Sequence, residues 1–341
     1  MCQKTPLKNR NYSIDIFRIL FAVYVVALHT FPSELEVLPF LSLTIKSFFR
    51  FSVPFFLIVS GYFFFKDPKI TAPALGKALK KIIITYLFWS CLYFIINFIT
   101  WGYSSPRGFI VDCFYSFFFC GSYYHLWYFP ALIFSICVSA LFCRLGLKKA
   151  LLFISIATIP LCYLITEYNL VSFIPNIFAG LLPKIISDGI QMIQALSYFC
   201  CGQLMIIAHQ KCVSSPKTIH LTYFLPVSVF LWFILIWCNY FFSLYAEFFI
   251  SVGVHLNVSL IVLVLLLHPL QKHSVLANKC RYLANFTYYA HPLFAFLLKM
   301  VNDKWFSFSD FWFFPFIATI TIGVGVLLYH INNKWINRII C

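Results

Sequence analysis

Long apolar segments recur along the whole chain and constrain its fold more than any other feature of the sequence. Ten of them approach the roughly 20 residues that a helix needs to cross a bilayer. They lie at about 14–30, 48–65, 82–100, 125–143, 149–165, 190–208, 222–240, 248–267, 285–301 and 311–331. Their residues do not alternate with the period of two that is typical of a barrel strand. The sequence therefore predicts an all-α, polytopic membrane protein with about ten transmembrane helices, in a single domain over residues 1–341.

Composition and charge distribution support this class and predict an orientation. Hydrophobic residues make up 62% of the chain and charged residues 10%, against about 45–50% and about 25% in soluble domains. The net charge is +15, but the basic residues gather in alternate loops, such as 66–81 and 268–284, and most acidic residues fall in the others. By the positive-inside rule, we expect both the N-terminus and the C-terminus to be cytoplasmic. Since topology explains the charge, no nucleic-acid partner is expected.

The thirteen cysteines do not suggest a metal centre. The sequence contains neither a C-x-x-C motif nor the paired Cys/His spacing of a zinc site, so no metal is expected. Most cysteines fall within the apolar segments, where they are expected to pack as small hydrophobic residues. Cys113 and Cys120 share one predicted external loop and could form a disulfide. The basic N-terminus followed by an apolar run resembles a signal peptide, but no small-x-small cleavage pattern follows His29, which predicts a retained first helix.

The first apolar segment carries three ionisable residues, Asp15, Arg18 and His29. Such groups are unfavourable in hydrocarbon and usually face a partner or a cavity. Arg18 and His29 are eleven residues apart, so they share a helix face about three turns apart, roughly 16 Å along the axis. Asp15 can pair with Arg18, although a snorkelling arginine fits the same position. We interpret Arg18 and His29 as bordering one crevice, with His29 as proton acceptor; a structural histidine is the alternative.

Later segments add candidate residues. Ser60-Gly61-Tyr62 closes the second segment, where Gly61 allows close helix packing or a turn. Lys66 follows at the inner boundary and could meet an anion or a lipid phosphate. His125 and Trp127 open the fourth segment, as part of an outward-facing polar site or as interface anchors.

Three further histidines are weighed in the same way. His291 in the ninth segment and His255 in the eighth are polar rings that belong in the bundle interior, as packing residues or as part of a site. His268, at an inner helix end, is read as structural.

These pieces together resemble the membrane acyltransferase family 3, bacterial inner-membrane proteins that O-acylate surface polysaccharides and related envelope molecules. The matching motifs are Asp15-x-x-Arg18 with His29, Val53-Pro54-Phe55-Phe56 leading into Ser60-Gly61-Tyr62, the run from His125 to Leu132, and the run from Tyr288 to Leu293. The resemblance implies transfer of an acyl group, expected to be acetyl, from cytosolic acyl-CoA to a hydroxyl of a cell-envelope carbohydrate. It also implies location in the bacterial inner membrane.

The resemblance assigns expected roles to the candidate residues. His29 and Arg18 match the family's essential pair, with Asp15 orienting Arg18, and the expected substrate-binding residues are Ser60, Gly61, Tyr62, Lys66, His125, Trp127 and His291. Many members carry Arg-x-Arg after Ser-Gly-Tyr, whereas this chain has one lysine there, which cannot reproduce the forked grip of arginine. The membrane half of vancomycin-resistance serine racemases is also similar to this family. The alternative function is a transporter of a small polar solute such as an amino acid, in which the same buried charges would line a translocation route.

Overall fold

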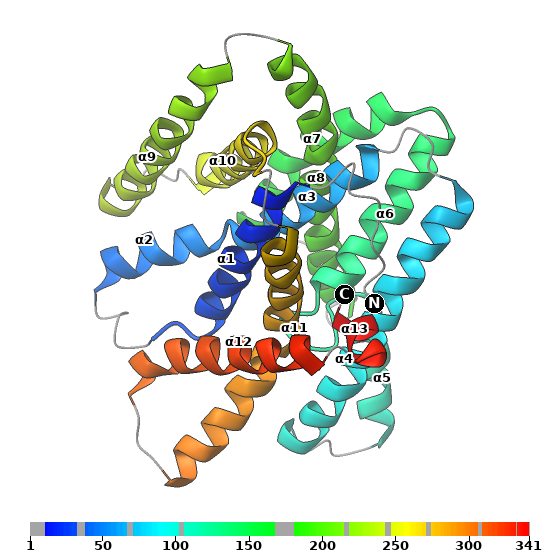
Figure 1. Cartoon of the computed structure of the whole chain (residues 1–341), viewed down its shortest axis with the longest axis vertical. Helices are drawn as coiled ribbons and strands as arrows, with labels where there is room; N and C mark the ends of the chain where they lie inside the picture. Colours follow the sequence, from blue (N-terminus) through cyan, green and yellow to red (C-terminus); the bar gives the residue numbers. More distant parts are fainter. Residues whose placement is uncertain are drawn as a thin grey trace. The chain divides into compact units, whose positions relative to one another are not determined.

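The computed structural model describes residues 11–32, 38–66, 71–101, 106–167, 181–214, 218–242, 247–270, 274–305, 309–331 and 333–340. Every regular element in these ranges is a helix, which confirms the all-α prediction (Figure 1). The elements are α1 (Tyr12–His29), α2 (Pro39–Phe49), α3 (Ser52–Lys66), α4 (Ala72–Trp101), α5 (Pro106–Phe118), α6 (Tyr128–Arg144), α7 (Lys148–Glu167), α8 (Leu181–Val213), α9 (Thr218–Phe242), α10 (Glu247–Leu267), α11 (Ser274–Trp305), the 3₁₀ turn η5 (Asp310–Trp312), α12 (Phe313–Ile331) and α13 (Lys334–Ile340).

Seven stretches of the described residues are long and apolar enough to cross a membrane. They are α1, the joined Pro39–Lys66, and parts or all of α4, α8, α9, α10 and α12, and each overlaps one of the predicted segments. The other three predicted segments, 125–143, 149–165 and 285–301, overlap α6, α7 and α11. The chain is therefore a multi-pass membrane protein; the total of ten spans and the cytoplasmic termini stay predictions.

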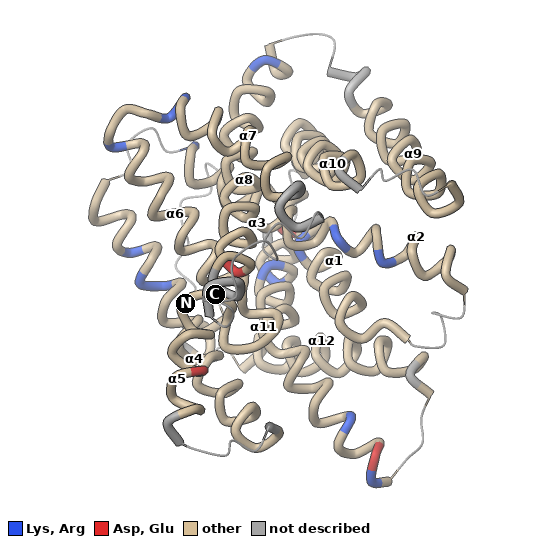
Figure 2. The backbone as a smooth tube through the Cα atoms, turned by 180° about the vertical axis from the view of Figure 1, so that it is seen from behind, with Lys and Arg blue, Asp and Glu red and all other residues tan. Residues whose placement is uncertain are grey.

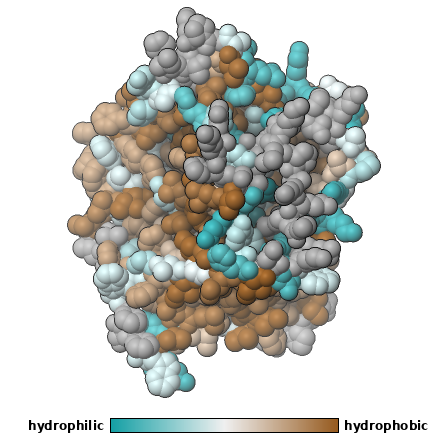
Figure 3. Space-filling model, in the orientation of Figure 1, coloured by the Kyte–Doolittle hydropathy of each residue, from teal (hydrophilic) through white to brown (hydrophobic). Residues whose placement is uncertain are grey.

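The surface of the described residues suits a lipid environment. Large hydrophobic side chains stay exposed on many helices, among them Phe153, Tyr223 and Phe242, each with at least 70% of its surface accessible. Extended hydrophobic areas are visible in the space-filling view (Figure 3). Charged residues occupy only short stretches of the tube, and most of each helix carries none (Figure 2). Exposed apolar patches of this extent are unusual on soluble monomers.

The second predicted segment differs in detail from the helices that form. The segment 48–65 is interrupted at Arg50, where α2 ends and α3 begins at Ser52. Pro54 follows in the first turn of α3, where its missing N–H has no helical partner to lose. Two further apolar stretches, 108–120 and 170–186, lie between the predicted segments, and their composition alone would let each lie on the membrane surface or dip into it. The first forms most of α5 and the turn that follows it. The second falls largely outside the described residues.

The chain divides into two compact units. Unit 1 comprises Met1–Phe56, His209–Ala246 and Leu260–Cys341, and unit 2 comprises Leu57–Ala208 and Glu247–Ser259. Whether the two act as the single domain predicted from the sequence stays a prediction. Each is therefore described separately.

In unit 1, α1 packs against α11, and α11 packs against α12 (Figure 1). Val26 of α1 joins Ile317 and Ala318 of α12 in a buried cluster, with Phe294 of α11 packed against it. These contacts hold the C-terminal half of α1 between two helices from the other end of the chain. The position of α1 therefore depends on residues distant in sequence.

In unit 2, Tyr86 joins α4 to its neighbours α5 and α6. Its ring stacks between Phe117 and Phe129, at centroid distances of 4.6 and 5.1 Å. Its hydroxyl donates to the Phe117 carbonyl oxygen over 2.7 Å, which satisfies the polar end of this buried side chain. The three helices form a framework for the segment between α5 and α6.

Candidate active site

The acidic and basic residues of α1 form an ion pair, as their spacing predicts. Nη1 of Arg18 lies 3.1 Å from Oδ1 of Asp15, and the two side chains keep only 16% and 5% of their surface accessible. A buried carboxylate beside a guanidinium neutralises part of its charge and fixes its orientation. The pairing is therefore confirmed, and Arg18 is not a freely snorkelling side chain.

The start of α1 is anchored to the end of α10. The helix is capped by Asn11, whose side-chain oxygen accepts from the Ile14 N–H over 3.2 Å. Nδ2 of Asn11 donates to the Leu265 carbonyl over 2.8 Å. Ser13 donates to the His268 carbonyl over 2.8 Å and accepts from the Leu270 N–H over 3.0 Å. The Asp15–Arg18 pair is thus carried on a helix end with a fixed position in unit 1.

His268, read as structural from the sequence, has that role in unit 1. Its carbonyl accepts the Ser13 hydroxyl, and its Nε2 lies 3.1 Å from the hydroxyl oxygen of Thr222. Both contacts join segments that are far apart in the chain. The structural reading of His268 is confirmed.

At the other end of α1, His29 stacks on His291 of α11. The ring centroids are 5.7 Å apart and the planes differ by 18°. His29 is exposed, whereas His291 has no accessible surface. Nδ1 of His291 lies 3.1 Å from the Thr287 carbonyl and 3.0 Å from the Tyr288 carbonyl. Because a carbonyl oxygen only accepts, Nδ1 carries the proton of the His291 ring.

A residue that sequence reasoning missed lies one helical turn before His291. Thr287 is fully buried, and its Oγ1 has no hydrogen-bond partner among the described residues. Residues four apart share a helix face, so the hydroxyl lies on the side of α11 that carries His291. The signal was the i, i+4 spacing to a histidine inside an apolar segment.

The helix between Arg18 and His29 is continuous, so the two residues share one face as predicted. Ala22 and Val25 lie between them and are buried. Phe21, on a neighbouring face, stacks on Phe55 with centroids 4.2 Å apart. The crevice that was expected to join Arg18 and His29 stays a prediction.

The Ser-Gly-Tyr element lies inside α3, in unit 2, and not at a turn. A Cβ on Gly61 would overlap the carbonyl oxygen of Phe199 in α8, and a Cβ on Gly202 would overlap the backbone of Tyr62 and Gly61. Two glycines therefore face each other where α3 crosses α8, and only a residue without a Cβ fits at either position. The close-packing interpretation of Gly61 is confirmed, and a direct substrate contact stays a prediction.

The other candidate residues of α3 range from buried to exposed. Oγ of Ser60 lies 3.4 Å from the hydroxyl oxygen of Tyr128 in α6. Tyr62 is buried, and the Lys66 ammonium lies 5.7 Å from the centroid of its ring. Lys66 itself is exposed, so its charge is accessible for an anion.

His125 is buried among tyrosines in the turn before α6. Its ring is edge-on to Tyr93 at 5.0 Å and to Tyr124 at 5.5 Å. Gly121 adopts a φ of +82°, which brings the chain back against Trp127 and leaves no room for a Cβ. This turn delays the start of α6 to Tyr128, three residues after the predicted start of the fourth segment. Trp127 is half-buried.

His255, the cysteine pair and metal binding were also considered from the sequence. Both ring nitrogens of His255 are bonded, Nε2 to the Ser197 hydroxyl and Nδ1 to the Ser251 carbonyl, each at 3.1 Å. The packing interpretation of His255 is confirmed. Cys113 and Cys120 are not joined to each other, so the disulfide that their spacing allowed does not form. The described residues contain no group of three or more His, Cys, Asp or Glu that could hold a metal.

Within unit 1, the structure thus brings together two pairs of the predicted site residues. Asp15 meets Arg18, and His29 meets His291, all within unit 1. The remaining candidates belong to unit 2: Ser60, Gly61, Tyr62, Lys66, His125 and Trp127. The sequence did not predict that His29 and His291 would be in contact.

Comparison with known proteins identifies the family. Curated relatives include two proteins named amino-acid racemase from Enterococcus faecalis. The first is 38% identical over 154 residues, 43% of this chain and 22% of the relative, and the second is 33% identical over 181 residues, 51% and 25%. A serine/alanine racemase from Enterococcus gallinarum is 33% identical over 153 residues, 41% and 21%. The matched regions thus span a quarter or less of these relatives, and no solved structure matches the chain.

The family model described as an acyltransferase domain matches nearly the whole chain. The match runs over residues 11–330 and includes both residue pairs of unit 1 and all the candidate residues of unit 2. This is far more than half of the sequence, and it agrees with the resemblance carried by the motifs. The chain therefore belongs to the membrane acyltransferase family 3.

Proposed function

We propose that this protein is a membrane O-acyltransferase. It moves an acyl group, expected to be acetyl, from acyl-CoA on the cytosolic side to a hydroxyl of a cell-envelope carbohydrate on the outer side. The observation that carries the proposal is the arrangement of α1, with the Asp15–Arg18 pair near its first turn and the His29–His291 stack at its last residue. A cation and an imidazole at opposite ends of one helix suit a reaction between substrates from two compartments.

In this proposal, His29 is the general base. It takes the proton of the acceptor hydroxyl while that oxygen bonds to the thioester carbonyl carbon. The carbon–sulfur bond then breaks, and the proton passes to the departing CoA thiolate, which leaves as the thiol. A positioned base contributes about 10²–10⁴-fold to the rate of such a reaction.

His291 is the positioning residue for His29. Its own ring is held by the hydrogen bond from Nδ1 to the carbonyls of Thr287 and Tyr288, so it offers a fixed surface for the exposed ring. A stacked neighbour limits the orientations that His29 samples before the hydroxyl arrives. Such preorganisation lowers the barrier without a contact to substrate.

Arg18 would hold the anionic part of the donor. Its guanidinium is a planar fork that matches phosphate or carboxylate oxygens, and Asp15 fixes one of its arms. The exposed ammonium of Lys66 supplies a second cation for the donor in place of the Arg-x-Arg found in many members. Trp127, Ser60, Tyr62 and His125 are proposed to contact the substrates.

The test is a complementation experiment with His29→Ala. In a strain that lacks the gene, we expect this variant to restore no ester on the envelope carbohydrate, as measured by mass analysis of purified glycan, with unchanged membrane abundance. His330→Ala is the matched control because His330 is an exposed histidine in the last turn of α12. Full esterification by the His29→Ala protein would refute the assignment.

Transport of an amino acid is the second candidate. It is favoured by the 38% identity to a protein whose name is amino-acid racemase. The same buried charges would then line a route for the solute. An unchanged glycan in the gene deletion, together with altered uptake of labelled serine or alanine, would support transport over acyl transfer.

A further inference from the structure

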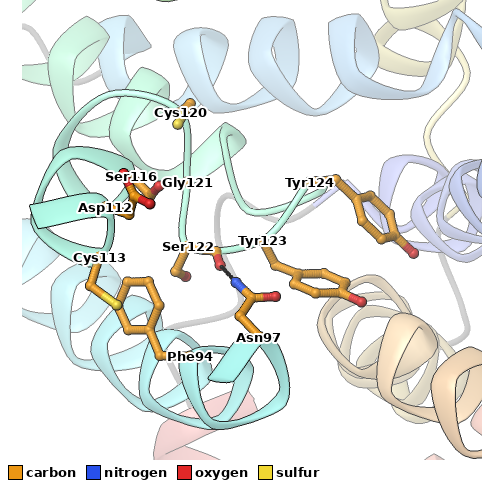
Figure 4. A pocket seen from close by; sticks show the side chains of 10 residues that line it. All are labelled: Phe94, Asn97, Asp112, Cys113, Ser116, Cys120, Gly121, Ser122, Tyr123 and Tyr124. Atoms are coloured by element: carbon orange, nitrogen blue, oxygen red, sulfur yellow. Dashed lines mark hydrogen bonds between the residues drawn. The ribbon is translucent and has the colours of Figure 1, made fainter. Parts of the chain in front are cut away.

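A cavity in unit 2 is lined by none of the residues predicted from the motifs, although His125 is edge-on to two of its lining rings, Tyr123 and Tyr124. Its volume is about 380 Å³, and its lining comes from α4, α5 and the turn that follows α5 (Figure 4). Its polar lining residues include Asn97, Asp112, Ser122 and Tyr123. The volume falls at the lower end of the roughly 300–1,000 Å³ of ligand pockets, which suits one small ring.

Contacts with α4 hold the turn that forms one wall of the cavity. Nδ2 of Asn97 donates to the Ser122 carbonyl over 3.0 Å, and the Ser122 hydroxyl donates to Oγ of Ser90 over 2.7 Å. The Tyr123 ring stacks on Tyr93 with centroids 4.6 Å apart and an angle of 20°. These contacts tie the turn to α4, so the cavity is preformed and little ordering is needed when a ligand binds.

One polar atom at the cavity is without a partner. Oδ1 of Asn97 is buried and accepts no hydrogen bond from any described residue. In Figure 4 the Asn97 amide lies beside the Tyr123 ring, with its nitrogen turned to Ser122. A buried acceptor without a donor is unfavourable, and a hydroxyl bound in the cavity would supply the missing donor.

The charge of the lining selects against anions. None of the residues that line the cavity is basic, and Asp112 contributes an exposed carboxylate. Burial raises the pKa of Tyr123, so its phenol keeps its proton and acts as a donor at neutral pH. The phosphates of a CoA donor are therefore unsuited to this cavity, whereas hydroxyl groups meet both donors and acceptors.

We propose that this cavity binds a neutral, polyhydroxylated ring, a sugar unit, against Tyr123, with hydroxyls bonded to Asn97 and Asp112. Aromatic rings offer a flat apolar surface, and the amide and carboxylate oxygens accept from hydroxyls at its edge. The assignment of this sugar to the acceptor rests on the proposed function. Binding of the sugar itself does not depend on catalysis.

The first experiment is a charge series on one ring type. The full-length protein in lipid nanodiscs is titrated calorimetrically at pH about 6 with glucose, N-acetylglucosamine, glucosamine and glucuronate. We expect saturable binding of at least one neutral sugar and binding of glucuronate weaker by about tenfold or more. Absence of binding by both neutral sugars, or equal binding of glucuronate, overturns the proposal. Glucosamine binding about tenfold tighter than both neutral sugars also overturns the proposal, in favour of a site for an amine.

The second experiment places the sugar in this cavity. We expect Tyr123→Leu and Asp112→Asn each to weaken binding of the neutral sugar by about tenfold, the scale of a central contact. Tyr223→Leu on α9 and Asp303→Asn on α11 are the matched controls, since both native side chains are exposed and far along the chain from the cavity. Tyr123→Phe keeps the ring and should bind within about threefold of the native protein, which guards against a folding defect. Unchanged binding in both cavity variants overturns the location.

The outcome is separable from that of the proposed function. His29→Ala should retain sugar binding while esterification is lost. If the protein does not bind the sugar but esterification still requires His29, only the sugar site is refuted. If the protein binds the sugar but deletion of its gene leaves the glycan unchanged, only the proposed acyl transfer is refuted.

Discussion

Two buried histidines, one in each unit, differ in what surrounds them. His255 of α10 stacks on Tyr198 of α8 at 3.8 Å, and both its ring nitrogens bond to neighbouring oxygens. His291 of α11 bonds through Nδ1 to its own helix and turns its ring face to the exposed His29. Burial of a polar ring in an apolar helix is thus common to both. What separates a packing histidine from a candidate site histidine is a second ionisable group that is accessible from outside.

The largest expected effect tests this difference directly. His291→Asn should reduce esterification per folded protein by about a hundredfold, because His29 loses the surface that orients it. His255→Asn is the matched variant and should lower the melting temperature while activity per folded protein stays near the native level. Glycan ester content, normalised to monodisperse protein in detergent, measures both. A similar loss of activity in both variants would remove the distinction between the two histidines.

The next prediction concerns packing in unit 2. Gly61→Ala inserts a Cβ into the backbone of Phe199, so we expect a loss of about 1–3 kcal/mol of stability and reduced membrane abundance. Gly76→Ala in α4 meets no neighbouring atom and should be neutral or slightly stabilising. Thermal unfolding followed by fluorescence-detected chromatography compares the two. Equal stability of the two variants would show that the α3–α8 crossing is looser than described.

A smaller effect is expected at Arg18. Arg18→Lys keeps the positive charge beside Asp15 but loses the fork, so donor use should weaken by about tenfold. The change should appear as a raised KM for acyl-CoA in membrane vesicles, with kcat less affected. Arg50→Lys, at the exposed end of α2, is the control. Native KM in the Arg18→Lys protein would assign Arg18 to topology instead of the donor.

The smallest effect distinguishes two buried threonines of unit 1. Thr287→Val removes a hydroxyl that has no partner among the described residues, so stability should stay level or rise by up to about 1 kcal/mol. Thr321→Val removes the hydroxyl that donates to the Ile317 carbonyl over 2.6 Å and should lower stability by a similar amount. Melting temperatures of the two purified proteins provide the comparison. Destabilisation by Thr287→Val would mean that its hydroxyl has a structural partner.

Local patterns predicted much of what this structure contains. Apolar length predicted where the helices lie, and the i, i+3 spacing predicted the pair of Asp15 and Arg18, because both depend on helix geometry alone. The same geometry placed Arg18 and His29 on one face. The breaks at Arg50 and before Tyr128 were misplaced because a short turn interrupts an apolar run. α4 and α11 also begin well before their predicted segments, since polar residues extend both helices.

Contacts between distant segments could not be predicted in this way. The stack of His29 on His291 and the fit of Gly61 against Gly202 depend on how helices pack, which a single apolar pattern does not encode. The cavity beside Asn97 was missed for a related reason. Its residues lie in a stretch rich in aromatic side chains, which the sequence indicates only as membrane interface.

The anchoring of Asn11 and Ser13 has a consequence for biogenesis. α1 is the first described helix to leave the ribosome, yet the groups that bond to its start, at Leu265, His268 and Leu270, are synthesised much later. His29 likewise cannot stack on His291 until α11 has been synthesised. The nascent α1 must therefore stay in the membrane, or beside the insertion machinery, with its acid and guanidinium paired only to each other until α10 and α11 arrive. Assembly of this region is completed late in translation, and a ribosome stalled before residue 265 would carry a helix inserted but not yet docked.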